Sequence, residues 1–488
     1  MKIKIKLLIV FVGFLFTTSC NKFLDVIPED RFLSEDIFQN EIAIQNSLNG
    51  IYLNIAKPKL YGENLSMGVL DIMGQYYILD IPNNVGSTTK VKSAWQRYML
   101  YDYTDKSVQE KFSVIWEESY TAILNVNTFI DGLSTAKGVV TDDRKDILLG
   151  EAYGLRAFLH FDMLRLFGPI DINSSTQISI PYLEKATEAI QPILSAQEVT
   201  KKIIADLDKA ENLLSNDPIV GDGVNANFEN DPRNDFYKLR NRRLNYYALL
   251  ALKSRVYLYM GDKENAFKYS VKVIEESSDK FLWVDPSLAD PANRNPDKIF
   301  SSEVLFGVHN TEMYNSQRTL FTSIGMGSSY FLIQESDDVL RAMYGNNEND
   351  YRFKLNFLIS SPNNGGFTAF IKYEDVNDKS LIRRNFQPLL RISECYLIAA
   401  ESSSSKEIAK GYLNEIRRNR GGTPLPNEFD LEREIQREYQ KEFWGEGQFF
   451  FYNKRKSLTS VLSGRGANVS VSLNQYVVPL PEVELQNR

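Results

Sequence analysis

Apolar residues recur at helical spacing along much of the chain, most clearly between residues 148 and 170. The repeating positions there are Leu148, Ala152, Leu155, Leu159, Met163 and Leu166. Steps of three and four place these side chains on one face of a helix. Gly168-Pro169 ends the helix, because proline cannot continue it. Arg156, Asp162 and Arg165 lie to the side of the apolar line, so the pattern predicts an amphipathic helix packed on one side.

The same spacing predicts further helices over residues 38–56, 112–130 and 199–214. Residues 244–276 resemble a tetratricopeptide-type helix pair, in which small residues let two antiparallel helices approach. A second pair is predicted over residues 392–420. The residues at the predicted contacts are Ser254, Tyr257 and Ala266 in the first pair, and Ala399, Ala400 and Ala409 in the second.

Long segments without helical periodicity separate these helices. Residues 61–103 are rich in Tyr, Gly and Asn, which predicts loops with short helices. Residues 280–390 mix Pro, Gly and Asn with strand-like pieces at 304–308 and 367–373. Because these insertions interrupt the helix pairs, the chain predicts a mostly α-helical repeat scaffold with long irregular insertions.

Composition and charge exclude several classes of protein. The net charge is −7 over 488 residues, which argues against a nucleic-acid-binding protein. With two histidines and two cysteines, the chain has no His-rich metal site and no disulfide framework. Cys395 lies in an apolar helical run and is predicted to be a small core residue. Residues 432–443 carry Glu434, Glu438 and Glu442 beside basic residues, a pattern that predicts a solvated, ion-paired helix surface.

The N-terminus has the pattern of an export signal. Three lysines precede an apolar run at residues 7–16, and small residues lead to Cys20. This pattern predicts a signal peptide over residues 1–19, and the run is shorter than the roughly 20 residues of a membrane-spanning helix. Cys20 resembles the lipidated cysteine of a bacterial lipobox, and acyl chains there would anchor the protein to a membrane. The alternative is ordinary signal cleavage beside an unrelated cysteine.

Several strings resemble the SusD/RagB family of outer-membrane nutrient-binding lipoproteins. Residues 155–170, LRAFLHFDMLRLFGPI, closely resemble its signature LRAF-x-YF-x-LVRLFG-x-(I/V)P. FLDVIP at residues 23–28 and YVVPLPEVEL at 476–485 resemble the opening and the tail of the family. Residues 436–455 match a further family segment in part, with Tyr439 and Phe449 in place of two arginines and Tyr452 in place of an aspartate.

The resemblance implies a lipid-anchored protein that faces the cell exterior. Such a protein captures oligosaccharide and delivers it to a SusC-like TonB-dependent transporter, without a cofactor and without catalysis. It also implies one SusD-like domain over residues 20–488, with an N-terminal part over about 20–220 and a C-terminal part over about 240–488. In this family, tetratricopeptide helix pairs form the scaffold and the irregular insertions form the ligand-binding face.

Aromatic residues of the insertions are the candidates for ligand contact, because sugar rings stack on flat side chains and orient through a few polar groups. Trp95, Tyr98 and Tyr314 are the first choices. The full set is Trp95, Tyr98, Tyr314, Tyr76, Tyr77, Tyr101, Trp283, Phe321 and Tyr330.

Three alternatives remain open at this stage. They are a RagB-type oligopeptide-binding protein, a scaffold that holds only protein partners, and a secreted hydrolase, although no G-x-S-x-G elbow is present. Oxygen-bearing residues of the loop at 217–235 offer ligands of the kind that calcium prefers, but without EF-hand spacing, so a plain solvated loop is expected. These residues are Asp222, Asn225, Asn227 and Glu229.

Overall fold

The computed structural model describes residues 37–77, 94–187, 189–224, 236–322, 337–360, 368–463 and 466–486. Several predicted features lie outside these residues: the signal segment 1–19, Cys20, Asn225, Asn227, Glu229 and Tyr330.

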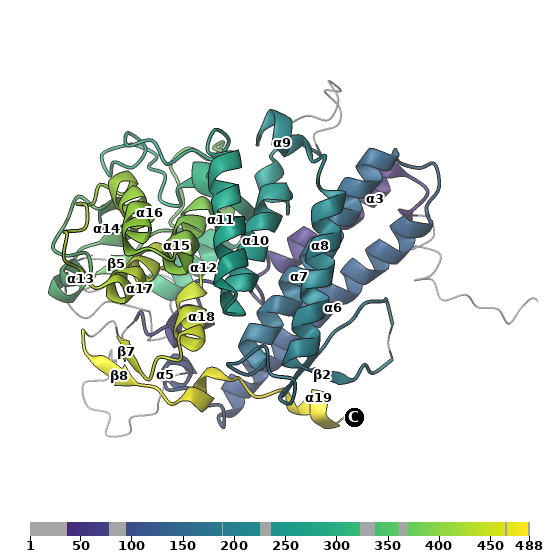
Figure 1. Ribbon diagram of the computed structural model, residues 1–488, viewed down its shortest axis with the longest axis horizontal. Coiled ribbons are helices and arrows are strands. Elements are labelled where there is room, and N and C mark those ends of the chain that lie inside the picture. The colour runs from purple at the N-terminus through teal and green to yellow at the C-terminus, as the bar shows by residue number, and fades with distance from the viewer. Residues whose placement is uncertain are drawn as a thin grey trace, which may run out of the picture.

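Four helices form the N-terminal part of the scaffold (Figure 1). They are α3 (Glu41–Ile55), α6 (Lys106–Thr135), α7 (Asp142–Phe167) and α8 (Ala196–Leu213). Helix α7 packs against both α6 and α8, and α3 packs against α6. The side chains of Asn40, Asp105 and Ser195 accept hydrogen bonds from the first backbone N–H groups of α3, α6 and α8, which fixes where each helix begins. The four helices predicted for this part of the chain are confirmed.

The C-terminal part continues the same stacking. Its helices are α10 (Tyr246–Tyr259), α11 (Lys263–Ser277), α15 (Ile392–Ser402), α16 (Lys406–Asn419), α17 (Leu431–Glu442) and α18 (Gln448–Arg455). Each of these helices packs on the next along the chain. Gly261 makes the turn between α10 and α11 with a φ of 78°, and Ala266 is buried against Ile398 of α15. Both tetratricopeptide-like pairs are therefore confirmed, and the fold is mostly α-helical.

The remaining elements are short. The helical ones are α4 (Val69–Met73), α5 (Ala94–Met99), α9 (Pro218–Asp222), η1 (Arg240–Arg242), η2 (Ser301–Glu303), α12 (Met313–Phe321), α13 (Asp337–Met343), α14 (Tyr351–Asn356), η5 (Leu473–Tyr476) and α19 (Glu482–Gln486). The strands form antiparallel pairs: β1 (Ile178–Pro181) with β2 (Ile193–Ser195), β3 (Val304–His309) with β6 (Phe386–Arg391), β4 (Phe357–Leu358) with β5 (Ala369–Phe370), and β7 (Ser460–Leu462) with β8 (Asn468–Ser470). The pairing of β3 with β6 closes the large insertion between the two helix pairs.

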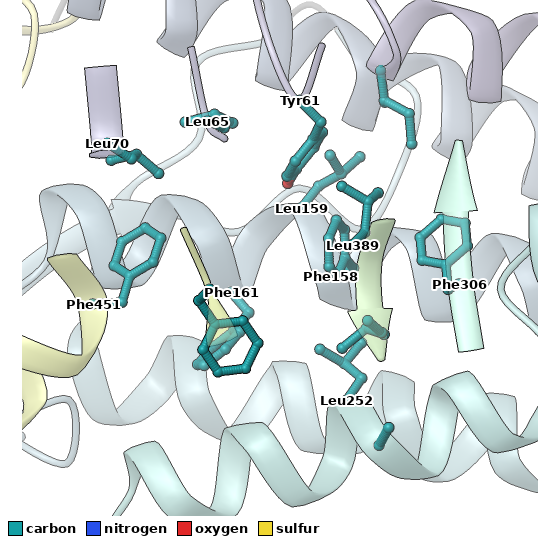
Figure 2. Close-up of a cluster of buried hydrophobic side chains, with 14 of the residues drawn as sticks. Tyr61, Leu65, Leu70, Phe158, Leu159, Phe161, Leu252, Phe306, Leu389 and Phe451 are labelled. Carbon is teal, nitrogen blue, oxygen red and sulfur yellow. The ribbon is translucent and has the colours of Figure 1, made fainter. Parts of the chain in front are cut away.

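The core gathers around the helix that carries the signature string (Figure 2). The ring of Phe158 on α7 lies 5.2 Å from that of Tyr61 and 6.0 Å from that of Phe306 on β3. Leu252 of α10 and Phe451 of α18 complete the cluster from the C-terminal part of the chain. Segments far apart in the sequence therefore share one hydrophobic core.

From Gly150 to Phe167, helix α7 is buried on all sides, so the prediction of one-sided packing is wrong. Its charged residues are buried because they are paired, either with other segments or with each other. Arg156 donates to Asp206 through Nε and Nη2, both at 2.7 Å. Arg165 donates to Asp162 at 2.8 Å, and Asp162 also accepts a hydrogen bond from Tyr61. Burying a charge is costly unless it is paired, and partners that come from elsewhere in the chain leave no trace in the periodicity of the helix.

The prediction of a solvated surface over residues 432–443 is also wrong in part, because Glu438 and Glu442 of α17 are buried. They belong to an ion cluster, defined here as Arg352, Arg391, Arg420, Glu303, Glu438 and Glu442. Arg352 donates to both glutamates of α17 at 2.9 Å. Arg420 donates to Glu303 at 2.6 Å and to Glu442 at 2.5 Å. The cluster thus ties α17 to α14, to η2 and to the residue that ends α16.

Candidate functional site: a polar groove beside helix α3

A groove of about 860 Å³ lies between α3 and the segment that begins at Phe236. The amide-bearing and acidic side chains on its α3 wall alternate with the exposed apolar residues Ile42 and Leu53. His309, at the end of β3, also lines the groove. The lining residues are Glu41, Ile42, Gln45, Asn46, Asn49, Tyr52, Leu53, Phe236, Lys238, Leu239, Arg242, Arg243 and His309.

A buried arginine anchors the wall opposite α3. Arg240 is fully buried and donates to Asp217 at 2.7 and 2.9 Å and to Glu151 at 2.5 Å. The preceding residue, Leu239, has a φ of 54°, a left-handed conformation that is uncommon for a residue other than glycine. Such strain persists only where surrounding contacts hold it. The ion pairs of Arg240 therefore fix the backbone that presents Arg242 and Arg243 to the groove.

Arg243 connects this wall to α3. Its guanidinium lies 3.6 Å from the centroid of the Phe236 ring. It donates to Asn49 on α3, and to Glu151 at 3.3 Å. The Tyr52 hydroxyl donates to Glu151 at 2.8 Å and accepts from the backbone N–H of Leu244. Burial raises the pKa of Tyr52 well above its usual value, so the hydroxyl stays protonated.

Arg242 and His309 form the end of the groove nearest β3. The Arg242 Nη1 atom lies 3.1 Å from His309 Nδ1, and its Nη2 donates to the carbonyl of Ile382. Burial, and then the charge of Arg242, lower the pKa of His309, which favours the neutral imidazole at pH 7. Since an arginine only donates, His309 accepts through Nδ1 and carries its proton on Nε2. Both residues thus offer hydrogen-bond donors.

Five predicted ligand contacts have no ring face open to a ligand. Their exposed fractions are 0% for Tyr76, 2% for Tyr77, 3% for Tyr98, 6% for Tyr101 and 0% for Phe321. Tyr76 stacks on Trp444 at 4.4 Å, and the Tyr101 hydroxyl donates to the carbonyl of Met73 at 2.7 Å. The two irregular insertions that hold them fold back onto the core, so these aromatics pack inside the protein.

Trp95, Trp283 and Tyr314 are partly exposed but lie in separate places. Trp95 packs on Tyr98, at 5.8 Å between ring centroids, and Trp283 packs on Tyr396 of α15 at 5.1 Å. Tyr314 is 38% exposed and borders a shallow depression of about 30 Å³. The structure does not bring these three into one platform, and none of them lines the groove.

Sequence reasoning missed the groove, although one signal was present. Residues 238–243 read KLRNRR, so four of six are basic in a chain of net charge −7. This run follows the polar loop that was considered only for calcium. The contribution of α3 was not foreseeable, because which face of an amphipathic helix borders a cavity depends on its neighbours.

The remaining singled-out residues have structural roles. His160 is fully buried, with Nδ1 2.9 Å from the carbonyl of Arg156, and its Nε2 accepts from the backbone N–H of Leu183. Burial lowers its pKa to about 3. Cys395 is a buried free thiol. Within the described ranges, no three side chains of the metal-binding types are grouped to hold an ion, and no helix is long and apolar enough to cross a membrane.

A helix-pair scaffold that carries a large groove is typical of helical-repeat binding proteins, and comparison with known proteins specifies the family. Residues 22–221 match the family model described as "Starch-binding associating with outer membrane", and residues 334–476 match that of the SusD family. The chain belongs to the SusD/RagB family.

Individual relatives are distant in sequence. The chain is 25% identical over 293 residues to SusD-like protein P38 of Formosa agariphila, covering 59% of this chain and 49% of the relative. It is 22% identical over 329 residues to a SusD-like protein of Bacteroides ovatus, covering 64% and 56%. These matches thus span about half the length of the curated relatives.

Solved structures agree in fold over nearly the whole chain. A structure described as a "Putative sugar binding protein" from Bacteroides vulgatus aligns with a TM-score of 0.69 at 20% identity. The alignment covers 92% of this chain and 96% of that one. Surface glycan-binding protein A from Bacteroides uniformis aligns with a TM-score of 0.65 at 18% identity, covering 92% and 98%. At these identities the likeness shows the fold.

Proposed function

We propose that this protein is a lipid-anchored receptor of the outer-membrane surface that captures oligosaccharide and delivers it to a SusC-like TonB-dependent transporter. The family description and the names of the glycan-binding neighbours support the ligand class. Lipidation at Cys20 supplies the anchor, and residues 20–488 form one domain facing the cell exterior. Its role is binding, without a catalytic step.

The observation that carries the proposal is the chemistry of the groove. Asn46 and Gln45 present amide groups, which both donate to and accept from hydroxyls. Phe236 and the exposed Leu53 supply apolar surface for the C–H face of a sugar ring. A cavity of about 860 Å³ falls within the range of ligand pockets. The groove therefore combines a few orienting polar groups with apolar walls.

Calorimetric titration of residues 21–488 with plant, host and microbial oligosaccharides tests the ligand class. We expect saturable binding to one class of glycan, and affinity electrophoresis in the corresponding polysaccharide should retard the protein. A pool of mixed peptides is titrated in parallel. Binding of peptides alone would replace oligosaccharide by oligopeptide as the nutrient. The absence of binding to both would favour the scaffold function.

The anchor and the transporter are tested separately in cells. Cys20→Ala should release the protein from the membrane fraction, and protease treatment of intact cells should cleave the wild-type protein if it faces outward. Affinity purification of the anchored protein should recover a large outer-membrane barrel protein. Recovery of the receptor without such a partner would contradict delivery to a transporter while leaving glycan binding intact.

A further inference from the structure

The arginines beside the groove are paired with carboxylates, with one exception. Glu41 accepts from Arg144 at 2.8 and 3.1 Å. On the opposite wall, Arg240 and Arg243 share Glu151, and Arg240 also pairs with Asp217. The three carboxylates near the groove are thus occupied by three arginines.

The exception is Arg242. Its guanidinium contacts the His309 imidazole, the Ile382 carbonyl and the Phe386 ring, the last at 5.4 Å from the ring centroid. No carboxylate of the described residues lies within ion-pair distance of its guanidinium. Burial lowers its pKa, yet an arginine stays charged at neutral pH. A partly buried charge without a counter-ion is unfavourable. An anion bound beside the Arg242 guanidinium would therefore be stabilised by it.

His309 adds a hydrogen-bond donor beside the Arg242 guanidinium. His309 accepts from Arg242 through Nδ1, which leaves its Nε2–H as a second donor at the same end of the groove. Planar guanidinium groups bind carboxylate and sulfate through charge-assisted hydrogen bonds, which are roughly twice as strong as neutral ones. The end of the groove nearest β3 is therefore suited to an anionic group.

We propose that the groove binds an acidic saccharide, and that a carboxylate or sulfate group of the sugar lies against Arg242 and His309. This inference rests on the proposed function, because it specifies the charge of the glycan that the receptor captures. The amides of α3 would then hydrogen-bond the hydroxyls of the same ring or of its neighbour.

The walls of the groove favour a saccharide over an acidic peptide. An extended peptide commonly binds by adding a strand to an open sheet edge. Here one wall is a helix and the other is the turn around η1. Only His309 comes from a strand, and it pairs with Phe386 of β6. The amide side chains of α3 can instead donate hydrogen bonds to sugar hydroxyls and accept them.

The test compares probes of matched length and different charge. Oligogalacturonate, its methyl-esterified neutral form, a sulfated dextran oligosaccharide and hexaglutamate are titrated into the wild-type protein, Arg242→Gln and Arg418→Gln. Arg418 lies on the surface of α16, with 68% of its side chain exposed, so Arg418→Gln makes the same change in net charge away from the groove. Thermal unfolding of each variant verifies that the groove still forms.

We expect the wild-type protein to bind at least one acidic saccharide, with affinity reduced by at least tenfold in Arg242→Gln and unchanged in Arg418→Gln. The uronate and the sulfate probes distinguish the two anionic groups. Equal binding of neutral and acidic probes would overturn the inference while the proposed function stands. Preference for hexaglutamate would overturn both the inference and the proposed capture of oligosaccharide. Failure of every acidic probe to bind would overturn the inference alone.

Discussion

The ion cluster and the groove both contain arginines that are wholly or partly buried, but they differ in how the charges are balanced. In the cluster, Arg352, Arg391 and Arg420 are each held by more than one carboxylate. In the groove, Arg242 faces an imidazole and a carbonyl. Paired charges of the first kind connect elements of the fold, whereas an unbalanced charge beside a cavity marks a place where a ligand can supply the counter-ion.

Removing a charge from the ion cluster should have the largest effect. Arg420→Ala leaves Glu303 and Glu442 buried with fewer partners, and breaking a buried pair in this way costs about 3–5 kcal/mol. Urea denaturation should show this loss in the free energy of unfolding, while Arg418→Gln, two residues earlier in the last turn of α16, should stay within about 0.5 kcal/mol of the wild type. A loss below about 1 kcal/mol for Arg420→Ala would show that the cluster does not hold the fold together.

Acid should remove the stability that Glu438 contributes through the same cluster. Burial opposes ionisation of Glu438, but Lys441, Arg352 and Arg417 outweigh it and lower its pKa from 4.5 to about 2. The unfolded chain therefore binds this proton more readily, so stability is present above pH 4.5 and is lost as the pH falls towards 2. The contribution of Glu438 is about 3 kcal/mol. Urea denaturation at pH 6, 4.5 and 3 should show the wild type approaching the stability of Glu438→Gln, and a constant difference between the two proteins would contradict the assignment.

The partly exposed aromatics outside the groove test how far the binding region extends. If the sugar chain reaches Trp95, Trp95→Ala should weaken binding by about 1–3 kcal/mol, the range of base stacking on aromatic side chains. Trp283→Ala and Tyr314→Ala are compared by the same titration. Unchanged affinity in all three folded variants would confine the site to the groove.

Arg242 should matter less for folding than any arginine of the cluster. Arg242→Gln removes hydrogen bonds to His309 and to the Ile382 carbonyl, which contribute about 1 kcal/mol or less to net stability. Its free energy of unfolding, measured in urea, should lie close to that of the wild type. A loss comparable to that of Arg420→Ala would make Arg242 a structural residue and remove the contrast between the two regions.

The smallest effect is expected at Gly50 in α3. A Cβ atom there would meet nothing within 4 Å, and Gly50 does not line the groove. Gly50→Ala should raise the free energy of unfolding by about 0.5–1 kcal/mol, because alanine loses less conformational entropy in a helix. Ligand affinity should be unchanged, and a decrease would indicate that the groove needs a flexible α3.

The sequence predicted the scaffold better than the site. Apolar periodicity located helices such as α3 and α8 because each buries one stripe of side chains, and that stripe follows from the local spacing of the residues. It failed for Arg156 and Glu438, whose partners Asp206 and Arg352 lie 50 and 86 residues away. Aromatic content drew attention to Tyr76 and Tyr101, but the path of the insertion decides whether such a ring faces a ligand or the core.

The most direct measurement is a crystal structure of the protein with an acidic oligosaccharide that binds in the titrations. The account predicts the sugar in the groove beside α3, with a carboxylate or sulfate oxygen within hydrogen-bond distance of the Arg242 guanidinium. An oligosaccharide bound against Trp95, Trp283 or Tyr314, with the groove filled only by water, would contradict it.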